Sequence, residues 1–156
     1  MEKQSKIFVA GHLGLVGSAI LRKLRAEGYD NIIVRPRNVL DLTDQHAVNI
    51  FFESEKPEYV FLAAAKVGGI VANSSYPGDF IYENLALSTN TIHAAYKSGV
   101  KKFMFLGSSC VYPKLAPQPI KEEYLLSGPL EPTNDAYAVS KIAGIKMIQA
   151  YRSQYN

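Results

Sequence analysis

The chain has 156 residues, of which 47% are hydrophobic and 20% charged, and its formal net charge is +3. This size and composition suit one globular domain with a hydrophobic core. Its scattered basic residues argue against nucleic-acid binding, no apolar run is long enough to span a membrane, and the first residues lack a signal peptide's apolar region.

Apolar runs alternate with helical patterns along the chain. Four short runs that are apolar on both faces predict buried strands at 6–10, 31–34, 59–63 and 102–106. Helices are predicted at 15–27, from a Thr43 cap through Phe52, at 77–98, and from 134–136 to the end. This alternation indicates an α/β fold, a doubly wound parallel sheet of the Rossmann type. Its expected strand order is 3-2-1-4, with 102–106 at an open edge.

No regular element is predicted between Gly107 and Asn134. Long structureless segments inside compact domains are usually functional, and each proline in this one fixes a backbone angle. We interpret the segment as a semi-rigid part of an active site, the alternative being a floppy insertion. Its prolines are Pro113, Pro117, Pro119, Pro129 and Pro132.

Three glycines lie where the first predicted strand turns into the first helix. Gly11 allows a tight turn, Gly14 lets the backbone approach a pyrophosphate, and Gly17 lets the helix pack against the strand. The first helical residues, Leu15 and Val16, present their amides to the phosphates. The pattern predicts dinucleotide binding.

The ends of the next two strands bear on which dinucleotide binds. Arg35 and Arg37 follow the second strand where an NAD site usually has an acidic residue. Two guanidiniums favour a 2′-phosphate and therefore NADP(H), unless they are only surface arginines. Asp41 is a candidate contact for the adenine edge. Small residues at the end of the third strand leave room for the ligand, in the run Leu62, Ala63 and Ala64.

Tyr137 and Lys141 are spaced i to i+4, which places both on one helical face. A nearby ammonium lowers the pKa of a phenol and makes it a better proton donor near neutral pH. Ser108, at the tip of the fourth strand, completes a set that could protonate a carbonyl as hydride arrives. Taken alone, the i to i+4 spacing of Tyr137 and Lys141 could also mark only the surface of an amphipathic helix.

These motifs together resemble the extended short-chain dehydrogenase/reductases, and more closely the GDP-L-fucose synthase family. The resemblance runs from residue 6 to the end of the chain. It is carried by Leu-Ala-Ala-Ala-Lys-Val-Gly-Gly-Ile (62–70), Leu-Gly-Ser-Ser-Cys-Val-Tyr-Pro-Lys (106–114), Glu-Pro-Thr-Asn (131–134) and Lys-Ile-Ala-Gly-Ile-Lys (141–146).

The resemblance implies a 3,5-epimerase and 4-reductase that converts GDP-4-keto-6-deoxy-D-mannose to GDP-L-fucose with NADPH. It matches Ser108, Tyr137 and Lys141 to the reductive set, with Tyr137 and Lys141 also holding the cofactor. It matches Cys110 to the cysteine that exchanges the proton beside the keto group, although a lone cysteine is more often an inert core residue. It also implies a homodimer through the helices near 77–98 and 135–155.

Two departures from the family pattern stand out. Leu13 replaces an arginine that helps to hold the 2′-phosphate, which leaves that task to Arg35 and Arg37. Family members are also roughly twice as long. We therefore expect 1–156 to be the NADP(H)-binding portion of a longer reductase, an incomplete Rossmann sheet without the substrate domain. None of His12, His46 and His93 matches the family's partner histidine.

Two other functions stay open. The chain could be a non-catalytic NADP(H)-binding or dimerising fragment, or a related NAD-dependent nucleotide-sugar epimerase or dehydratase. The single cysteine, Cys110, excludes an internal disulfide framework and fits a reducing compartment, so we expect a cytoplasmic protein. We expect no metal site.

Overall fold

The computed structural model describes residues 1–155. The chain forms two compact units. The first consists of Met1–Ala65 and Ala86–Leu106, and the second of Lys66–Leu85 and the chain from Gly107 onward. The assignment of the whole chain to one dinucleotide-binding domain stays a prediction beside this division.

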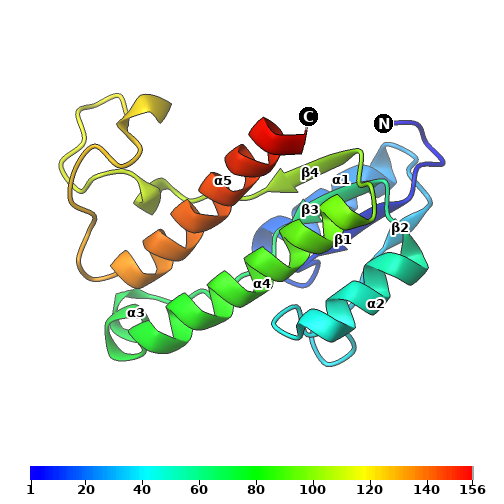
Figure 1. Ribbon diagram of the computed structural model, residues 1–156, viewed down its shortest axis with the longest axis horizontal. Coiled ribbons are helices and arrows are strands. Elements are labelled where there is room, and N and C mark those ends of the chain that lie inside the picture. Colours follow the sequence, from blue (N-terminus) through cyan, green and yellow to red (C-terminus); the bar gives the residue numbers. More distant parts are fainter. Residues whose placement is uncertain (156) are drawn as a thin grey trace. The chain divides into compact units, whose positions relative to one another are not determined.

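The first unit holds one parallel sheet. Its strands are β1 (Ile7–Ala10), β2 (Ile32–Ile33), β3 (Tyr59–Leu62) and β4 (Lys102–Phe105). They lie in the order β2-β1-β3-β4, with Phe8 of β1 opposite Val60 of β3 (Figure 1). The predicted open edge is confirmed, because β4 is the last strand in that order.

The predicted strand order 3-2-1-4 is wrong. β3 pairs with β1 on the side away from β2. The reason lies in the chain after β2, which forms turns between residues 34 and 44 and adds no strand beyond β2. The chain then returns to the opposite side of β1. The side on which the chain adds new strands therefore reverses between β1 and β3, and open α/β sheets bind ligands at such a point, at the carboxyl ends of the strands.

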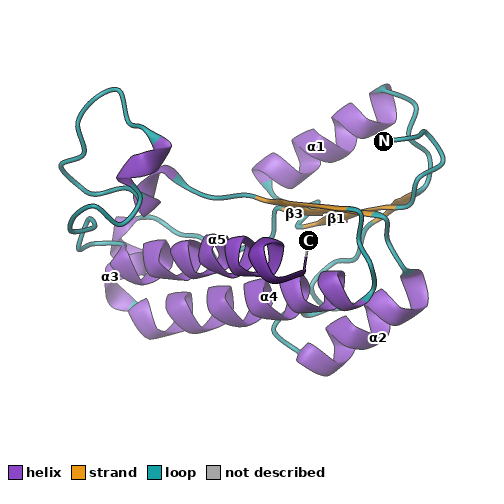
Figure 2. Cartoon of the chain, turned by 45° about the horizontal axis from the view of Figure 1, so that its top comes forward, coloured by secondary structure: helices purple, strands orange, loops and turns teal. Residues whose placement is uncertain are grey.

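Helices cover both faces of this sheet. α1 (Leu15–Ala26) packs on one face, and α2 (Gln45–Glu55) with the second half of α4 (Pro77–Lys97) packs on the other (Figure 2). Side chains alternate along β1 accordingly, because successive residues of a strand point to opposite faces. The doubly wound α/β arrangement is confirmed.

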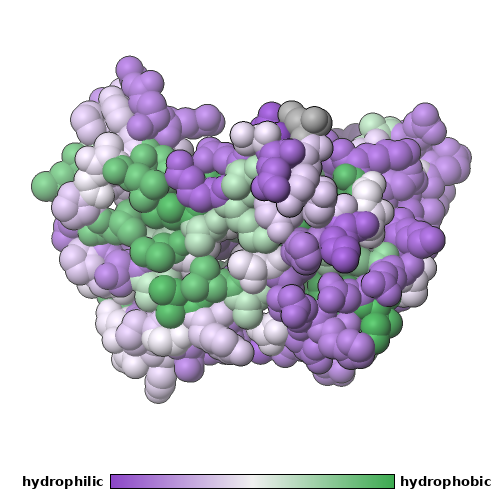
Figure 3. Space-filling view, viewed as in Figure 1, coloured by the Kyte–Doolittle hydropathy of each residue, from purple (hydrophilic) through white to green (hydrophobic). Residues whose placement is uncertain are grey.

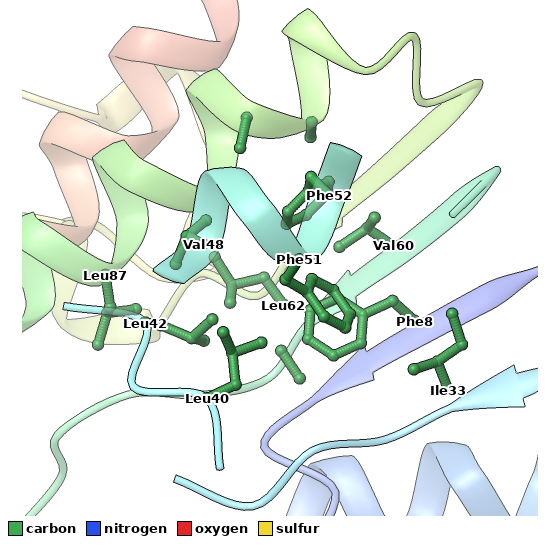
Figure 4. Close-up of a cluster of buried hydrophobic side chains, with 13 residues drawn as sticks. Phe8, Ile33, Leu40, Leu42, Val48, Phe51, Phe52, Val60, Leu62 and Leu87 are labelled. Atoms are coloured by element: carbon green, nitrogen blue, oxygen red, sulfur yellow. The ribbon is translucent and has the colours of Figure 1, made fainter. Parts of the chain in front are cut away.

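Three phenylalanines pack together in the larger core cluster. Phe8 of β1 packs against Phe51 and Phe52 of α2, with ring centroids 4.6 and 6.1 Å away (Figure 4). Val60 and Leu62 of β3 fill the same cluster and are buried. Each such side chain stabilises the fold by about 1.5–3 kcal/mol when fully buried. This packing fixes the strand ends that carry the candidate site.

α2 begins one residue later than predicted. Asp44, not Thr43, is its N-cap and accepts a hydrogen bond from the amide of Ala47 at 3.1 Å. The Thr43 hydroxyl instead donates to Asp41 at 2.8 Å. Both residue types suit a cap. The Thr43 side chain is engaged by Asp41, so Asp44 caps the helix.

The second unit contains α3 (Ile70–Ser75), the first half of α4, two short 3₁₀ turns and α5 (Asp135–Tyr155). The turns, η1 (Ser109–Val111) and η2 (Glu122–Tyr124), are the regular elements described between Gly107 and Asn134. α3 was not predicted. In the part of the chain that the structure describes, no helix combines the length and apolar character needed to cross a membrane.

Candidate active site

The glycine turn after β1 is sterically closed to larger residues at two positions. Gly11 has a φ of +81°, and a Cβ there would lie 2.6 Å from the backbone nitrogen of Ala64. A Cβ on Gly17 would lie 2.1 Å from the carbonyl oxygen of Gly11. Gly14 is less crowded, because a Cβ there would lie 3.4 Å from the same oxygen. The turn thus lies directly against the end of β3, where Ala63 and Ala64 are half-buried.

The N-terminus of α1 is open to an anion. Gly14 is its N-cap and supplies no side-chain hydrogen bond, and no acidic residue lies in the first turn. Leu13 and Leu15 are exposed at 78% and 89%, and Val16 at 50%. Unsatisfied helix amides and the helix dipole favour phosphate at such an end. The residues present therefore fit the pyrophosphate of a dinucleotide.

The two arginines after β2 have different partners. Arg35 donates to Glu55 at 2.6 Å and to the Val34 carbonyl at 2.9 Å, and its guanidinium lies 5.9 Å from the Phe51 ring centre. Arg37 pairs with Asp41 at 3.3 Å. Arg35 is thus engaged by α2, whereas the Arg37 side chain is 66% exposed.

Asp41 organises the turn that carries Arg37. It accepts hydrogen bonds from the amide and hydroxyl of Thr43 at 2.9 and 2.8 Å. Burial acts to raise the pKa of Asp41, but these bonds and the charge of Arg37 outweigh it, so the pKa is lowered. Asp41 is therefore an anion held in place, and the adenine contact that we expect of it stays a prediction.

In the second unit, η1 and α5 pack together and bring three of the predicted catalytic residues into contact. The Cys110 thiol donates to the Ser108 hydroxyl oxygen at 3.1 Å. A side-chain hydrogen bond also joins Ser108 to Tyr137. Ser108 is the residue before η1 and has extended backbone.

Lys141 lies one helical turn after Tyr137. Its Nζ is 5.8 Å from the centre of the Tyr137 ring, and its side chain is almost fully buried. Burial lowers the pKa of Lys141, and the nearby Cys110 charge opposes that effect. A buried amine held beside the phenol is the arrangement that the i, i+4 spacing predicted.

The expected effect of the lysine on the tyrosine is not found. The pKa of Tyr137 is raised, first by burial and then by the charge of Cys110, and the Ser108 hydrogen bond only partly offsets this. We had expected Lys141 to lower that pKa. The spacing correctly placed the two side chains together but carried no information on how deeply each is buried.

Sequence reasoning missed Asn84 of α4. Its buried side chain accepts from the amide of Lys66 and donates to the carbonyl of Lys66, both at 2.9 Å. The Lys66 ammonium pairs with Glu83 at 2.5 Å and Asp79 at 3.4 Å. These contacts anchor the loop after β3. The available signal was a polar residue on the predicted apolar face of the helix.

Comparison with known proteins gives a consistent picture. A putative GDP-L-fucose synthase 2 from Arabidopsis thaliana is 65% identical over 99% of this chain, which covers 47% of that protein. The GDP-L-fucose synthase of Escherichia coli K12 is 56% identical over 99% of the chain and 48% of its own length. The chain spans about half the length of these curated relatives.

Solved structures agree with these sequence relatives. A GDP-mannoheptose C4 reductase from Campylobacter jejuni, solved with NADP bound, superposes with a TM-score of 0.96 and is 45% identical over 99% of this chain and 49% of its own. The model of the NAD dependent epimerase/dehydratase family matches residues 7–156. This chain therefore belongs to the NAD dependent epimerase/dehydratase family.

Proposed function

We propose that the protein converts GDP-4-keto-6-deoxy-D-mannose to GDP-L-fucose with NADPH, as a 3,5-epimerase and 4-reductase. The observation that carries this proposal is the hydrogen-bonded set of Cys110, Ser108 and Tyr137. It brings together a group that can remove a proton from carbon and a group that can donate a proton to a carbonyl oxygen. The names of the sequence relatives support the substrate. Because the chain spans about half of those relatives, the proposal concerns the activity of the whole protein.

Epimerisation needs a group that removes a proton from a carbon beside the keto group. A neighbouring carbonyl acidifies such C–H bonds, and a thiolate can accept the proton. Cys110 is half-buried in η1 and holds its proton toward Ser108. In the proposed role the Cys110 thiol first releases its proton to solvent. The resulting thiolate takes the proton from one face of the sugar carbon, and a proton supplied from solvent on the other face inverts that carbon.

Reduction needs a proton at the carbonyl oxygen. NADPH, when bound, supplies the hydride. Tyr137 donates its phenolic proton to the oxygen, and Ser108 hydrogen-bonds the same oxygen and holds the phenol. Tyr137 is protonated at neutral pH, as an ordinary phenol is, and the raised pKa makes it a weaker acid than a free phenol. We assign Lys141, which is buried beside the phenol, to holding the cofactor rather than to lowering the pKa of Tyr137.

We assign the preference for NADPH to Arg37. Its exposed guanidinium can approach a 2′-phosphate, while Asp41 holds the turn from which it extends. Arg35 is bound to Glu55 and packs over Phe51, which supports a structural role for it. The sequence predicts that both arginines bind the 2′-phosphate, and we assign that contact to Arg37 alone.

We also infer that the protein forms a homodimer through α4 and α5. Figure 3 shows hydrophobic side chains gathered on one face of the second unit. Tyr82 of α4 is 69% exposed and Val139 of α5 is 43% exposed. Exposed apolar surface of this kind marks interaction sites. A cytoplasmic location stays a prediction.

The deciding experiment follows NADPH oxidation and sugar products by NMR in D₂O. The whole wild-type protein should bind NADPH, exchange the protons beside the keto group and oxidise the cofactor. Tyr137→Phe should stop reduction but leave exchange, and Cys110→Ser should stop exchange. NADPH binding without exchange or oxidation would instead support a non-catalytic module. Tightly held NAD after purification would support the epimerase or dehydratase reading.

A further inference from the structure

We propose that Lys114 and Glu131 form a clasp that positions Cys110 relative to Tyr137. Lys114 lies four residues after Cys110, and Glu131 lies six residues before Tyr137. The proline-rich segment between them leaves η1 and returns to α5. Closing the base of this segment fixes the chain on both sides of the active set. The catalytic meaning of the clasp rests on the proposed function.

The base of the segment is closed by two contacts of one residue. The Lys114 ammonium pairs with Glu131 at 2.9 Å. The Lys114 amide donates to the carbonyl of Pro129, also at 2.9 Å. One contact uses the side chain and the other the backbone. Together they hold the two limbs of the segment, residues 113–117 and 127–132, at a fixed alignment to each other.

Close packing between the two limbs supports the same alignment. A Cβ on Gly128 would lie 3.4 Å from the Cβ of Pro113, so the limbs approach as closely as ordinary contact allows. Beside this contact the limbs enclose a hollow of about 370 Å³, lined mainly by residues 113–117 and 127–132. The prolines on both limbs restrict their backbones. The clasp therefore acts between stiff segments, which can transmit a fixed spacing.

Glu131 also organises the start of α5. Its other carboxylate oxygen accepts from the amide and the hydroxyl of Thr133 at 3.3 and 3.2 Å. Its carbonyl accepts from the amide of Asn134, and the Asn134 carbonyl accepts from Ala138 in the first turn of α5. Glu131 thus links Lys114, through its carboxylate, to the start of the helix that carries Tyr137, through its backbone carbonyl.

An isolated exposed ion pair contributes little to stability, about 0–1 kcal/mol. The Lys114 and Glu131 side chains are 53% and 34% exposed, so their attraction alone would not hold the segment. The Thr133 bonds and the backbone bond to Pro129 make the pair part of a network. We therefore assign it a positioning role, with a modest effect on global stability.

The test uses the thiol as a local reporter, because Cys110 is the only cysteine in the chain. The rate of alkylation by iodoacetamide is measured across pH for Lys114→Met and Glu131→Gln. Glu131→Gln keeps an oxygen for Thr133 and removes the charge. We expect each variant to alkylate about threefold faster, a change of the size that such a pair allows, because Cys110 loses its fixed place beside Ser108.

Three controls make the result decisive. The double variant should match the single ones, because both remove the same interaction. Lys114→Arg should restore the wild-type rate. The exposed Lys121–Glu123 pair, 3.9 Å apart in the same segment, should change nothing when replaced by Met and Gln. Alkylation rates in Lys114→Met and Glu131→Gln equal to those of this control pair would overturn the clasp.

The thiol measurement also separates the clasp from the proposed function. If wild type shows no turnover while the clasp variants alkylate faster, the positioning role stands and the proposed function fails. If wild type turns over and both clasp variants keep the wild-type kcat and alkylation rate, the clasp fails and the function stands. Where both hold, kcat should fall about threefold with an unchanged Kd for NADPH.

Discussion

Ser108 lies between Cys110 and Tyr137, accepting from the thiol at 3.1 Å and hydrogen-bonded to the phenol. One hydroxyl therefore contacts both the proposed base of epimerisation and the proposed acid of reduction. Changes at this single side chain should affect both half-reactions, and the direction of the effect on Tyr137 follows from the physics of its pKa.

Ser108→Ala should move the alkaline limb of the reduction profile to higher pH. The Ser108 bond lowers the pKa of Tyr137, while burial raises it, so removing the bond raises the pKa further. Tyr137 acts in its protonated form, so activity is present below this pKa and is lost as pH rises through it. The rate on the plateau should fall about 10²-fold. The measurement is kcat against pH.

Ser109→Ala is the matched control for that variant, because Ser109 is the exposed neighbour of Ser108. It should leave both the plateau and the limb where they are in wild type. A limb that moves to lower pH in Ser108→Ala would contradict the geometry, since the hydroxyl would then be raising the pKa of Tyr137.

Lys141→Met should stabilise the chain while removing reductase activity. Burial lowers the pKa of Lys141, so the unfolded state binds its proton more tightly. The cost of the buried charge is complete below the folded-state pKa and is relieved as pH rises toward the ordinary value of 10.5. The Tm should rise by about 2–5 °C at pH 7.

The pH dependence of that gain provides the check. Thermal unfolding of both proteins near pH 10 should show a smaller difference in Tm than at pH 7, because the lowered pKa leaves a smaller fraction of the folded lysine charged near pH 10. An equal or larger difference near pH 10 would mean that packing of the methionine, rather than removal of the charge, stabilises the variant.

The sequence predicted the parts of the fold that depend on local pattern. Strand positions, helix α1 and the long helix α4 all follow from the spacing of apolar residues. The strand order does not, because it depends on whether the chain after β2 adds a further strand, and the turns around Asp41 decide against it. α3 was missed because six residues are too few for a periodic signal.

In the candidate site, too, local motifs predicted some features, and others depend on contacts between distant parts of the chain. The strand-end position of Ser108 placed it with Tyr137, and the family resemblance added Cys110, but neither could reveal that Glu55 engages Arg35. Nor could they reveal the contact of Lys114 with Glu131 across the proline-rich segment. These are contacts between residues 17 and 20 positions apart that no helical or strand period links, so only the folded chain displays them.

Two glycine substitutions should separate folding from binding. Gly17→Ala places a methyl group 2.1 Å from the Gly11 carbonyl and should destabilise the first unit by about 3 kcal/mol or more. Gly14→Ala meets that oxygen only at 3.4 Å. It should fold normally but lose dinucleotide affinity, since a methyl group would obstruct the approach of the pyrophosphate.

Thermal unfolding and dinucleotide titration of both variants check this pair. The expected pattern is a large drop in Tm for Gly17→Ala and a near-normal Tm with weak binding for Gly14→Ala. Wild-type affinity in Gly14→Ala would show that the pyrophosphate does not lie over this turn, and the anion site at α1 would have to be abandoned.

Arg37→Ala should weaken NADPH binding and leave NADH binding unchanged. The loss of a charge-assisted contact to the 2′-phosphate costs about 1.5–3 kcal/mol, which is roughly a tenfold to hundredfold rise in the Kd for NADPH. NADH lacks that phosphate and serves as an internal control in the same titration. The exposed guanidinium of Arg37 motivates this assignment.

Arg35→Ala is the matched variant, since Arg35 lies two residues earlier and already pairs with Glu55 at 2.6 Å. Lys6 still neutralises Glu55 at 3.1 Å when Arg35 is removed. The free energy of unfolding should therefore fall by no more than about 1 kcal/mol, with the Kd for NADPH unchanged. If Arg35→Ala rather than Arg37→Ala weakened NADPH selectively, Arg35 would have to leave Glu55 when the cofactor binds, and the assignment of the 2′-phosphate to Arg37 would be wrong.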